Sequence, residues 1–193
     1  MLTNTQVWWH LSRASGIVSW VLLTLTVVWG LLLTTRLLRE VDRPAWLLDL
    51  HRWLGTLTWV TTGIHLAALL ADSYVQFSIA DLLVPFSASW KTGPVAWGVV
   101  GFYLVVLVQV TSRWMKHMSR RVWKALHLAS YPAFVCISLH AYLAGTDAKV
   151  LMFQILGVVL ITSVAIFTLM RVQLAMRAGT TTRTSTGGPT PLR

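Results

Sequence analysis

The sequence contains a single cysteine, Cys136, and only six acidic residues among 193. One cysteine excludes a disulfide, an iron–sulfur cluster and a cysteine-based metal site within one chain, so any metal must be held by other residues. Charged side chains make up 11% of the chain and hydrophobic ones 55%. Because so little polar surface cannot cover a water-soluble core, we predict an integral membrane protein whose surroundings are the lipid bilayer.

Five uncharged apolar runs each approach the ~20 residues that a helix needs to cross hydrocarbon. These runs are Ala14–Thr35, Trp53–Ala71, Thr92–Ser112, Ala125–Thr146 and Val150–Met170. They predict an all-α membrane bundle over residues 1–171, followed by a disordered cytoplasmic tail over residues 172–193, which is rich in Thr, Gly, Pro and Ser from Ala178 on. The half-apolar segment Asp72–Lys91 is expected to form a short helix on the membrane surface or over a site.

The basic residues predict the orientation, because Lys and Arg near the ends of spans are retained on the cytoplasmic side. Thirteen of the 16 fall in Arg36–Arg52, Arg113–Lys124 and the chain after Met170, against Arg13, Lys91 and Lys149 on the other side. The N-terminus is therefore expected outside and the C-terminus in the cytoplasm. The net charge of +10 is then a topology signal, and since it is spread over three membrane-flanking segments, no nucleic-acid partner is expected.

Four of the six histidines fall in two of the predicted spans: His51 and His65 in the second, His127 and His140 in the fourth. A histidine in hydrocarbon must find a partner, and neutral imidazole is a common ligand of metals and haem iron. His51 and His65 are separated by roughly 21 Å of helical rise and lie about 40° apart around the helix. Because the two spans run in the same direction, His51 matches His127 in depth and His65 matches His140, so each pair can clamp one haem.

Two haems roughly 20 Å apart can pass an electron through a hydrocarbon core of about 30 Å, which one centre cannot bridge. The fourth span fits this scheme less simply. Its histidines are thirteen residues apart, which on an ideal helix rotates them about 140° from a common face. Pro132 lies between them and is expected to kink the helix and absorb the mismatch.

Other interpretations of the histidines remain open at this stage. Each could simply hydrogen-bond a neighbouring helix, and a non-redox transporter or scaffold could use them for proton or metal binding. His10 is expected to be an interfacial anchor or an extra ligand or proton donor, and His117 a solvated loop residue. No side chain is assigned a catalytic role.

Two segments carry a family resemblance: LHRWLGTLTWVTTGIH over Leu50–His65 and LHLASYPAFVCISLH over Leu126–His140. With 13 and 12 residues between their histidines, they resemble the ferric reductase-like transmembrane domain, which ferric reductases and NADPH oxidases share. The resemblance covers roughly Trp8–Asp147. It implies two b-type haems, an inner one on the first histidine of each segment and an outer one on the second.

The resemblance also involves LSRASG, Leu11–Gly16, which is similar to a family motif whose arginine sits by the outer haem. Arg13 occupies that position here. It is expected either to pair a haem propionate or to extend its charge to the outer headgroups.

The sequence also departs from the larger members of the family. It ends about 20 residues after the last predicted span and has no G-x-G-x-x-G element, so we expect the haem-containing membrane component of an oxidoreductase without its own flavin or NAD(P)H domain. Five spans instead of six fit the loss of a leading helix. Flavin would enter only through a partner, and the donor would be a separate flavoprotein or a quinol.

The stand-alone haem subunits of bacterial methionine-sulfoxide reductase systems offer the nearest analogy. They imply a multi-pass protein of the plasma membrane and an outer acceptor such as ferric iron, oxygen or a reductase partner. The alternative is a quinol-linked di-haem cytochrome in which electrons flow inward. The predicted topology does not distinguish it from a subunit that passes electrons outward.

Overall fold

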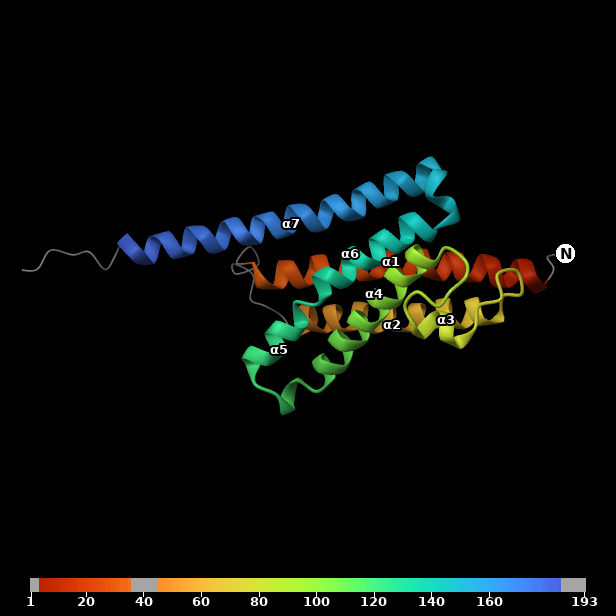
Figure 1. The fold of residues 1–193 in the computed structure, drawn as a ribbon. Helices are drawn as coiled ribbons and strands as arrows, with labels where there is room; N and C mark the ends of the chain where they lie inside the picture. The colour runs from red at the N-terminus through yellow and green to blue at the C-terminus, as the bar shows by residue number, and fades with distance from the viewer. Residues whose placement is uncertain (1–3, 36–44, 185–193) are drawn as a thin grey trace, which may run out of the picture.

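The computed structural model describes residues 4–35 and 45–184, and within them it contains helices and short connections but no strand (Figure 1). Five of the described helical segments are long and apolar enough to cross a membrane. They are Gln6–Thr34, Ala45–Ala71, Thr92–Arg113, Arg120–Ala144 and Leu151–Arg177. The prediction of an all-α, multi-pass membrane chain with five spans is confirmed.

The elements follow one another along the chain with short connections. They are α1 (Asn4–Thr34), α2 (Ala45–Ala71), α3 (Ile79–Leu83), α4 (Thr92–Arg113), η2 (Met115–His117), α5 (Arg120–His127), α6 (Ser130–Ala144), η3 (Thr146–Lys149) and α7 (Leu151–Thr184). The first and last helices extend beyond the predicted spans. Helix α1 includes His10, which was expected to be an interfacial anchor, and α7 continues to Thr184, into the segment predicted as a disordered tail. Residues 36–44 and 185–193 lie outside the described residues.

The long helices pack in pairs, α1 along α2 and α4 along α6, and α1 also contacts α6 and α7 (Figure 1). Where they meet, the Trp20 side chain is 1% exposed and donates its Nε1–H to the Ser138 hydroxyl at 3.0 Å. Phe134 and Phe153 complete this core with aliphatic side chains. Below, the end of the molecule that carries α3 is called the α3 end, and the opposite end the α5 end.

The fourth span is broken between α5 and α6, just before Pro132. The Ala129 N–H donates to the Leu126 carbonyl at 3.0 Å and the Tyr131 N–H to the Leu128 carbonyl at 3.1 Å. These bonds join residues three apart, as in a tighter 3₁₀ turn. Pro132 has no N–H to continue the α-helical ladder and lies in the first turn of α6, where none is needed. The change in winding expected from the proline thus occurs at its N-terminal side.

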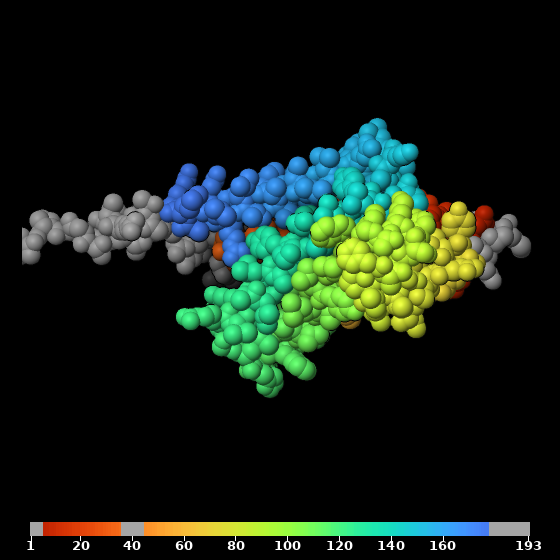
Figure 2. Space-filling view, in the orientation of Figure 1, coloured from red at the N-terminus to blue at the C-terminus, as the bar shows by residue number. Residues whose placement is uncertain are grey.

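The segment between α2 and α4 folds over the α3 end of the bundle (Figure 2). Its short helix begins with a capping box, in which the Asp81 N–H donates to the Ser78 hydroxyl at 3.2 Å and the Ser78 N–H to the Asp81 carboxylate at 2.8 Å. The Ser78 hydroxyl and amide hydrogen bonds lower the pKa of Asp81 below its ordinary value. The Tyr103 hydroxyl of α4 donates to the Leu83 carbonyl at 2.6 Å and fixes the end of α3.

Candidate functional site

The structure brings the four spanning histidines together as two pairs, one at each end of the bundle. The ring centres of His51 and His127 are 6.1 Å apart, and those of His65 and His140 are 6.5 Å apart. A metal–imidazole bond of about 2.0–2.1 Å on each side, with about 1.1 Å from nitrogen to ring centre, gives a separation of about 6.3 Å. Each pair is therefore spaced to hold one metal ion between two imidazoles.

The pair at the α3 end has its tautomers fixed by the backbone. His65 Nδ1 lies 2.7 Å from the Ser12 carbonyl oxygen of α1, and His140 Nδ1 lies 2.9 Å from the Pro94 carbonyl oxygen of α4. Because a carbonyl oxygen only accepts, each Nδ1 carries the proton and donates it. The Nε2 lone pair of each ring is then free to bind a metal, which is the usual role of this second hydrogen bond.

A glycine lies against each of these two rings. A Cβ atom on Gly16 would lie 3.0 Å from His65 Nδ1, and one on Gly98 would lie 2.7 Å from His140 Nδ1. Each glycine follows the acceptor carbonyl by four residues, and residues four apart share one face of a helix. The missing side chain therefore leaves room for the imidazole to approach the carbonyl.

The pair at the α5 end is less completely bonded. A Cβ on Gly30 of α1 would lie 3.1 Å from His51 Cε1, so this ring also packs on a glycine. His51 Nδ1 is nevertheless buried without a hydrogen-bond partner. His127 Nδ1 lies 3.3 Å from the Ser112 hydroxyl, a longer contact in which either atom can be the donor. The two pairs thus differ in what surrounds their rings.

Sequence reasoning missed these glycines, although a signal for two of them was present. Gly16 and Gly30 are fourteen residues apart, and so are His51 and His65. Since α1 packs antiparallel along α2, equal spacings place each glycine opposite one histidine. A match between glycine spacing on one span and histidine spacing on the next indicates helices that approach closely at two depths.

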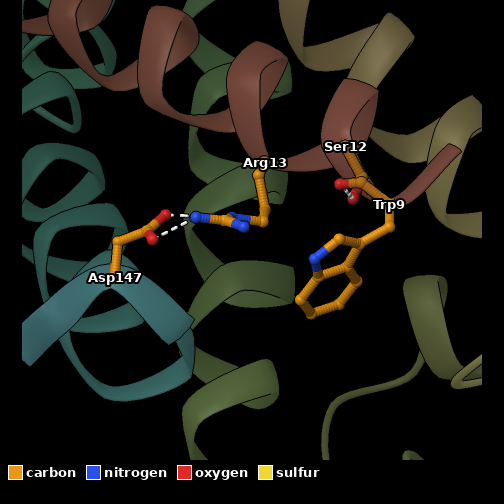
Figure 3. A network of polar contacts seen from close by, with 4 residues as sticks. All are labelled: Trp9, Ser12, Arg13 and Asp147. Atoms are coloured by element: carbon orange, nitrogen blue, oxygen red, sulfur yellow. Dashed lines mark hydrogen bonds and ion pairs between the residues drawn. The ribbon is translucent and has the colours of Figure 1, made fainter. Parts of the chain in front are cut away.

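Arg13, the remaining predicted site residue, forms an ion pair at the α3 end (Figure 3). Its Nε donates to Asp147 Oδ2 at 2.9 Å, and its Nη2 contacts the other carboxylate oxygen. The guanidinium carbon lies 5.8 Å from the Trp9 ring centre. Asp147 of η3 was not predicted as a site residue, because its position in a turn gave no sign of a partner 134 residues away.

A cavity of about 190 Å³ at the α3 end connects these groups. His65, His140, Arg13 and Asp147 all line it, together with mainly apolar side chains. Val75, Phe77, Leu82 and Trp90 of the segment around α3 line it as well, so this segment forms one wall. The cavity is mostly apolar, and two imidazoles and one guanidinium–carboxylate pair form part of its lining.

The donor set distinguishes between kinds of metal site. Within residues 4–35 and 45–184, no group of three or more His, Cys, Asp or Glu side chains converges to hold a bare metal ion. Each pair supplies two imidazoles, the number of axial ligands that six-coordinate haem iron takes from a protein when the porphyrin provides the other four nitrogens. The residues present therefore fit haem. His10 and His117 are exposed and belong to neither pair.

Comparison with known proteins identified one family. Residues 15–138 match the family described as "Ferric reductase like transmembrane component". Three of the four paired histidines lie in this range, while His140 and Arg13 lie just outside it. Neither the curated proteins nor the solved structures gave a match.

Proposed function

Because the chain belongs to the ferric reductase-like transmembrane family, and this membership indicates electron transfer in a membrane, we propose that it is a bis-haem b-type electron-transfer subunit. His51 and His127 would hold one haem, and His65 and His140 the other. The chain would then be the haem-containing membrane component of an oxidoreductase. When bound, haem supplies one-electron redox chemistry at iron.

The observation that supports this proposal best is the spacing of the two ring pairs. Separations of 6.1 and 6.5 Å match two imidazoles that would hold one metal ion between them, and at the α3 end both rings have Nε2 free. A hydrogen bond between the two rings themselves would bring them closer together. Histidines that only joined helices through the backbone would have no reason to face each other in pairs.

The residues that hold the two sites also set the distance between them. Helix α2 is continuous from Ala45 to Ala71, so the fourteen residues from His51 to His65 correspond to about 21 Å of rise. Sites this far apart would lie one near each surface of a hydrocarbon core of about 30 Å. Apolar side chains of α1, α2, α4 and α6 between the two sites would exclude water and keep the route dry.

We further propose that the α5 end faces the cytoplasm and the α3 end the outside of the plasma membrane. The α5 end carries exposed cations at Arg113, Lys116, Arg120, Arg121 and Lys124, as expected for the retained side. Electrons would enter there from a separate flavoprotein or from a quinol, with flavin supplied only by that partner. They would leave at the α3 end to ferric iron, oxygen or a reductase partner.

The test is a haem count on the chain purified in mild detergent from haem-replete cells. We expect about two b-type haems per chain by pyridine haemochrome, about one in His65→Ala and about one in His51→Ala. The control is His117→Ala, because His117 is exposed on η2 and belongs to neither pair. A colourless wild-type protein would refute the proposal and favour a proton or metal transporter.

A further inference from the structure

The α5-end site contains a second buried nitrogen that lacks an acceptor. Four buried side-chain polar atoms have no partner among the described residues, and two of them, His51 Nδ1 and Trp123 Nε1, belong to the surroundings of this site. An indole N–H that is buried usually finds an acceptor, and a buried donor without one costs free energy. Leaving the Trp123 donor unpaired is therefore unfavourable unless a bound group accepts it.

Trp123 lies directly against a paired histidine. It precedes His127 by four residues on α5, so the two side chains are neighbours on one helix face. Their ring centres are 5.1 Å apart with 31° between the planes, while His127 and His51 are 6.1 Å apart. The indole thus stacks on one of the two rings proposed to hold the haem.

The two unpaired nitrogens differ in where a hydrogen-bond acceptor could come from. His51 Nδ1 packs near Gly30, and the Thr26 carbonyl lies beside it in the position that Ser12 occupies for His65, so a small adjustment can supply its acceptor. For Trp123, the surrounding charges are positive. The sequence contains no Asp or Glu from Leu82 to Thr146, which includes all of α4, α5 and α6. The described acidic residue at this end, Asp49, is 56% exposed and pairs with Arg52, so the acceptor that complements this environment is an anionic oxygen of a bound group.

Haem carries such oxygens on its two propionates. Carboxylates avoid hydrocarbon, so propionates are directed toward the nearer membrane surface. Trp123 lies one helical turn from His127 toward the start of α5, next to the exposed basic residues Arg120, Arg121 and Lys124. A lipid phosphate has similar chemistry, but it would approach from the membrane surface, whereas a propionate would extend from a haem bound to the ring on which the indole stacks.

We propose that the Trp123 indole N–H donates a hydrogen bond to a propionate of the haem held by His51 and His127. This inference rests on the proposed function, because it needs a haem at the α5 end. Trp123 would act as a binding residue that fixes the position of the macrocycle, in addition to stacking on its ligand. The basic side chains nearby would supply charge, and the indole a directed donor.

The experiment compares Trp123→Phe, which keeps an aromatic ring but removes the donor, with Trp114→Phe as the matched control. Trp114 lies at the same end and is 64% exposed. Both are purified as full-length haem-loaded chains, and the rate of haem transfer to apomyoglobin is measured. We expect the α5-end haem of Trp123→Phe to transfer on the order of tenfold faster, as for the loss of one charge-assisted hydrogen bond. The α3-end haem and the control should keep wild-type rates.

The same samples separate the outcomes. The His51→Ala variant identifies the α5-end haem signal, and retention of the α3-end haem shows that the Trp123 variant is folded. Wild-type protein with two haems and a Trp123→Phe variant with unchanged transfer and midpoint potential would overturn the inference alone, and would assign the indole to a lipid phosphate or to packing. Wild-type protein without haem would overturn the proposed function as well. If Trp123→Phe fails to hold the α3-end haem, Trp123→Leu, which also lacks the donor, is measured in its place under the same criteria.

Discussion

Replacing Gly98 by alanine places one methyl group against the His140 imidazole and so tests the geometry of the α3-end pair. The added Cβ would lie 2.7 Å from Nδ1, 2.8 Å from Cε1 and 3.0 Å from Cγ. Ordinary contact begins at 3.4 Å, so the ring would have to move by at least 0.7 Å, the difference from 2.7 Å. Such a movement also strains the 2.9 Å hydrogen bond from Nδ1 to the Pro94 carbonyl.

The size of the effect follows from the cost of overpacking. Adding a methyl group to a well-packed interior costs about 1–3 kcal/mol, which corresponds to haem binding weakened by roughly 5–150-fold. Because the displaced ring belongs to one pair, we expect Gly98→Ala to lose haem from the α3 end and to retain it at the α5 end. The assay is the haemochrome count combined with the rate of haem transfer to apomyoglobin.

Two matched controls are available in the same bundle. A Cβ on Gly93, five residues earlier on α4, or on Gly63 of α2 would meet no atom within 4 Å. Gly63→Ala should keep both haems and stabilise its helix by roughly 0.5–1 kcal/mol. If Gly98→Ala keeps a wild-type α3-end haem, or if all three variants lose haem equally, the close packing of His140 on Gly98 does not position a ligand.

Two further predictions concern the surroundings of each pair. Asp147→Asn removes the ion pair with Arg13. Because both side chains are partly exposed, 20% for Asp147 and 34% for Arg13, the change should lower stability by only about 1 kcal/mol in thermal unfolding. If Arg13 also serves a propionate, Arg13→Gln will release the α3-end haem faster than Asp147→Asn does, whereas equal effects would show a purely structural pair. If His127 holds haem through Nε2, its Nδ1 carries the proton and donates to the Ser112 hydroxyl. Ser112→Ala removes that acceptor, which would make the imidazole less basic. A redox titration should then show a more positive potential for the α5-end haem alone, and an unchanged or equally shifted pair of potentials would contradict this reasoning.

The sequence was sufficient for the coarse fold because lipid constrains it strongly. A span needs about 20 apolar residues with all backbone groups bonded internally, so five runs predicted five helices. Their ends were less predictable, because polar residues tolerate helix at the membrane surface. Helix α1 therefore begins at Asn4, before the predicted start at Ala14, and α7 continues to Thr184.

The pairing of the histidines was also predictable in outline, since residue separation on a helix fixes depth and approximate face. The partners of these rings were not predictable in the same way. A backbone carbonyl such as that of Ser12 has no residue-type signature, and Asp147 meets Arg13 only after α6 and η3 have returned the chain to the α3 end. Such contacts depend on how helices pack, and a single sequence does not specify packing at the level of atoms.

The irregularity of the fourth span links these observations. On α4, the position fourteen residues after Gly98 is Ser112, which faces His127 through its hydroxyl where the other three rings pack on glycines. His127 is also the last residue of α5, an eight-residue helix set off from α6 by the turn before Pro132. A side chain at the end of a short helix is held by fewer helical hydrogen bonds than one inside a long span, so its position depends more on neighbouring side chains. Stacking of Trp123 on this ring provides such support, and the indole N–H of Trp123 is buried without an acceptor. The departure from regular spacing and the unpaired indole therefore occur at one place, where a bound carboxylate would complete the site.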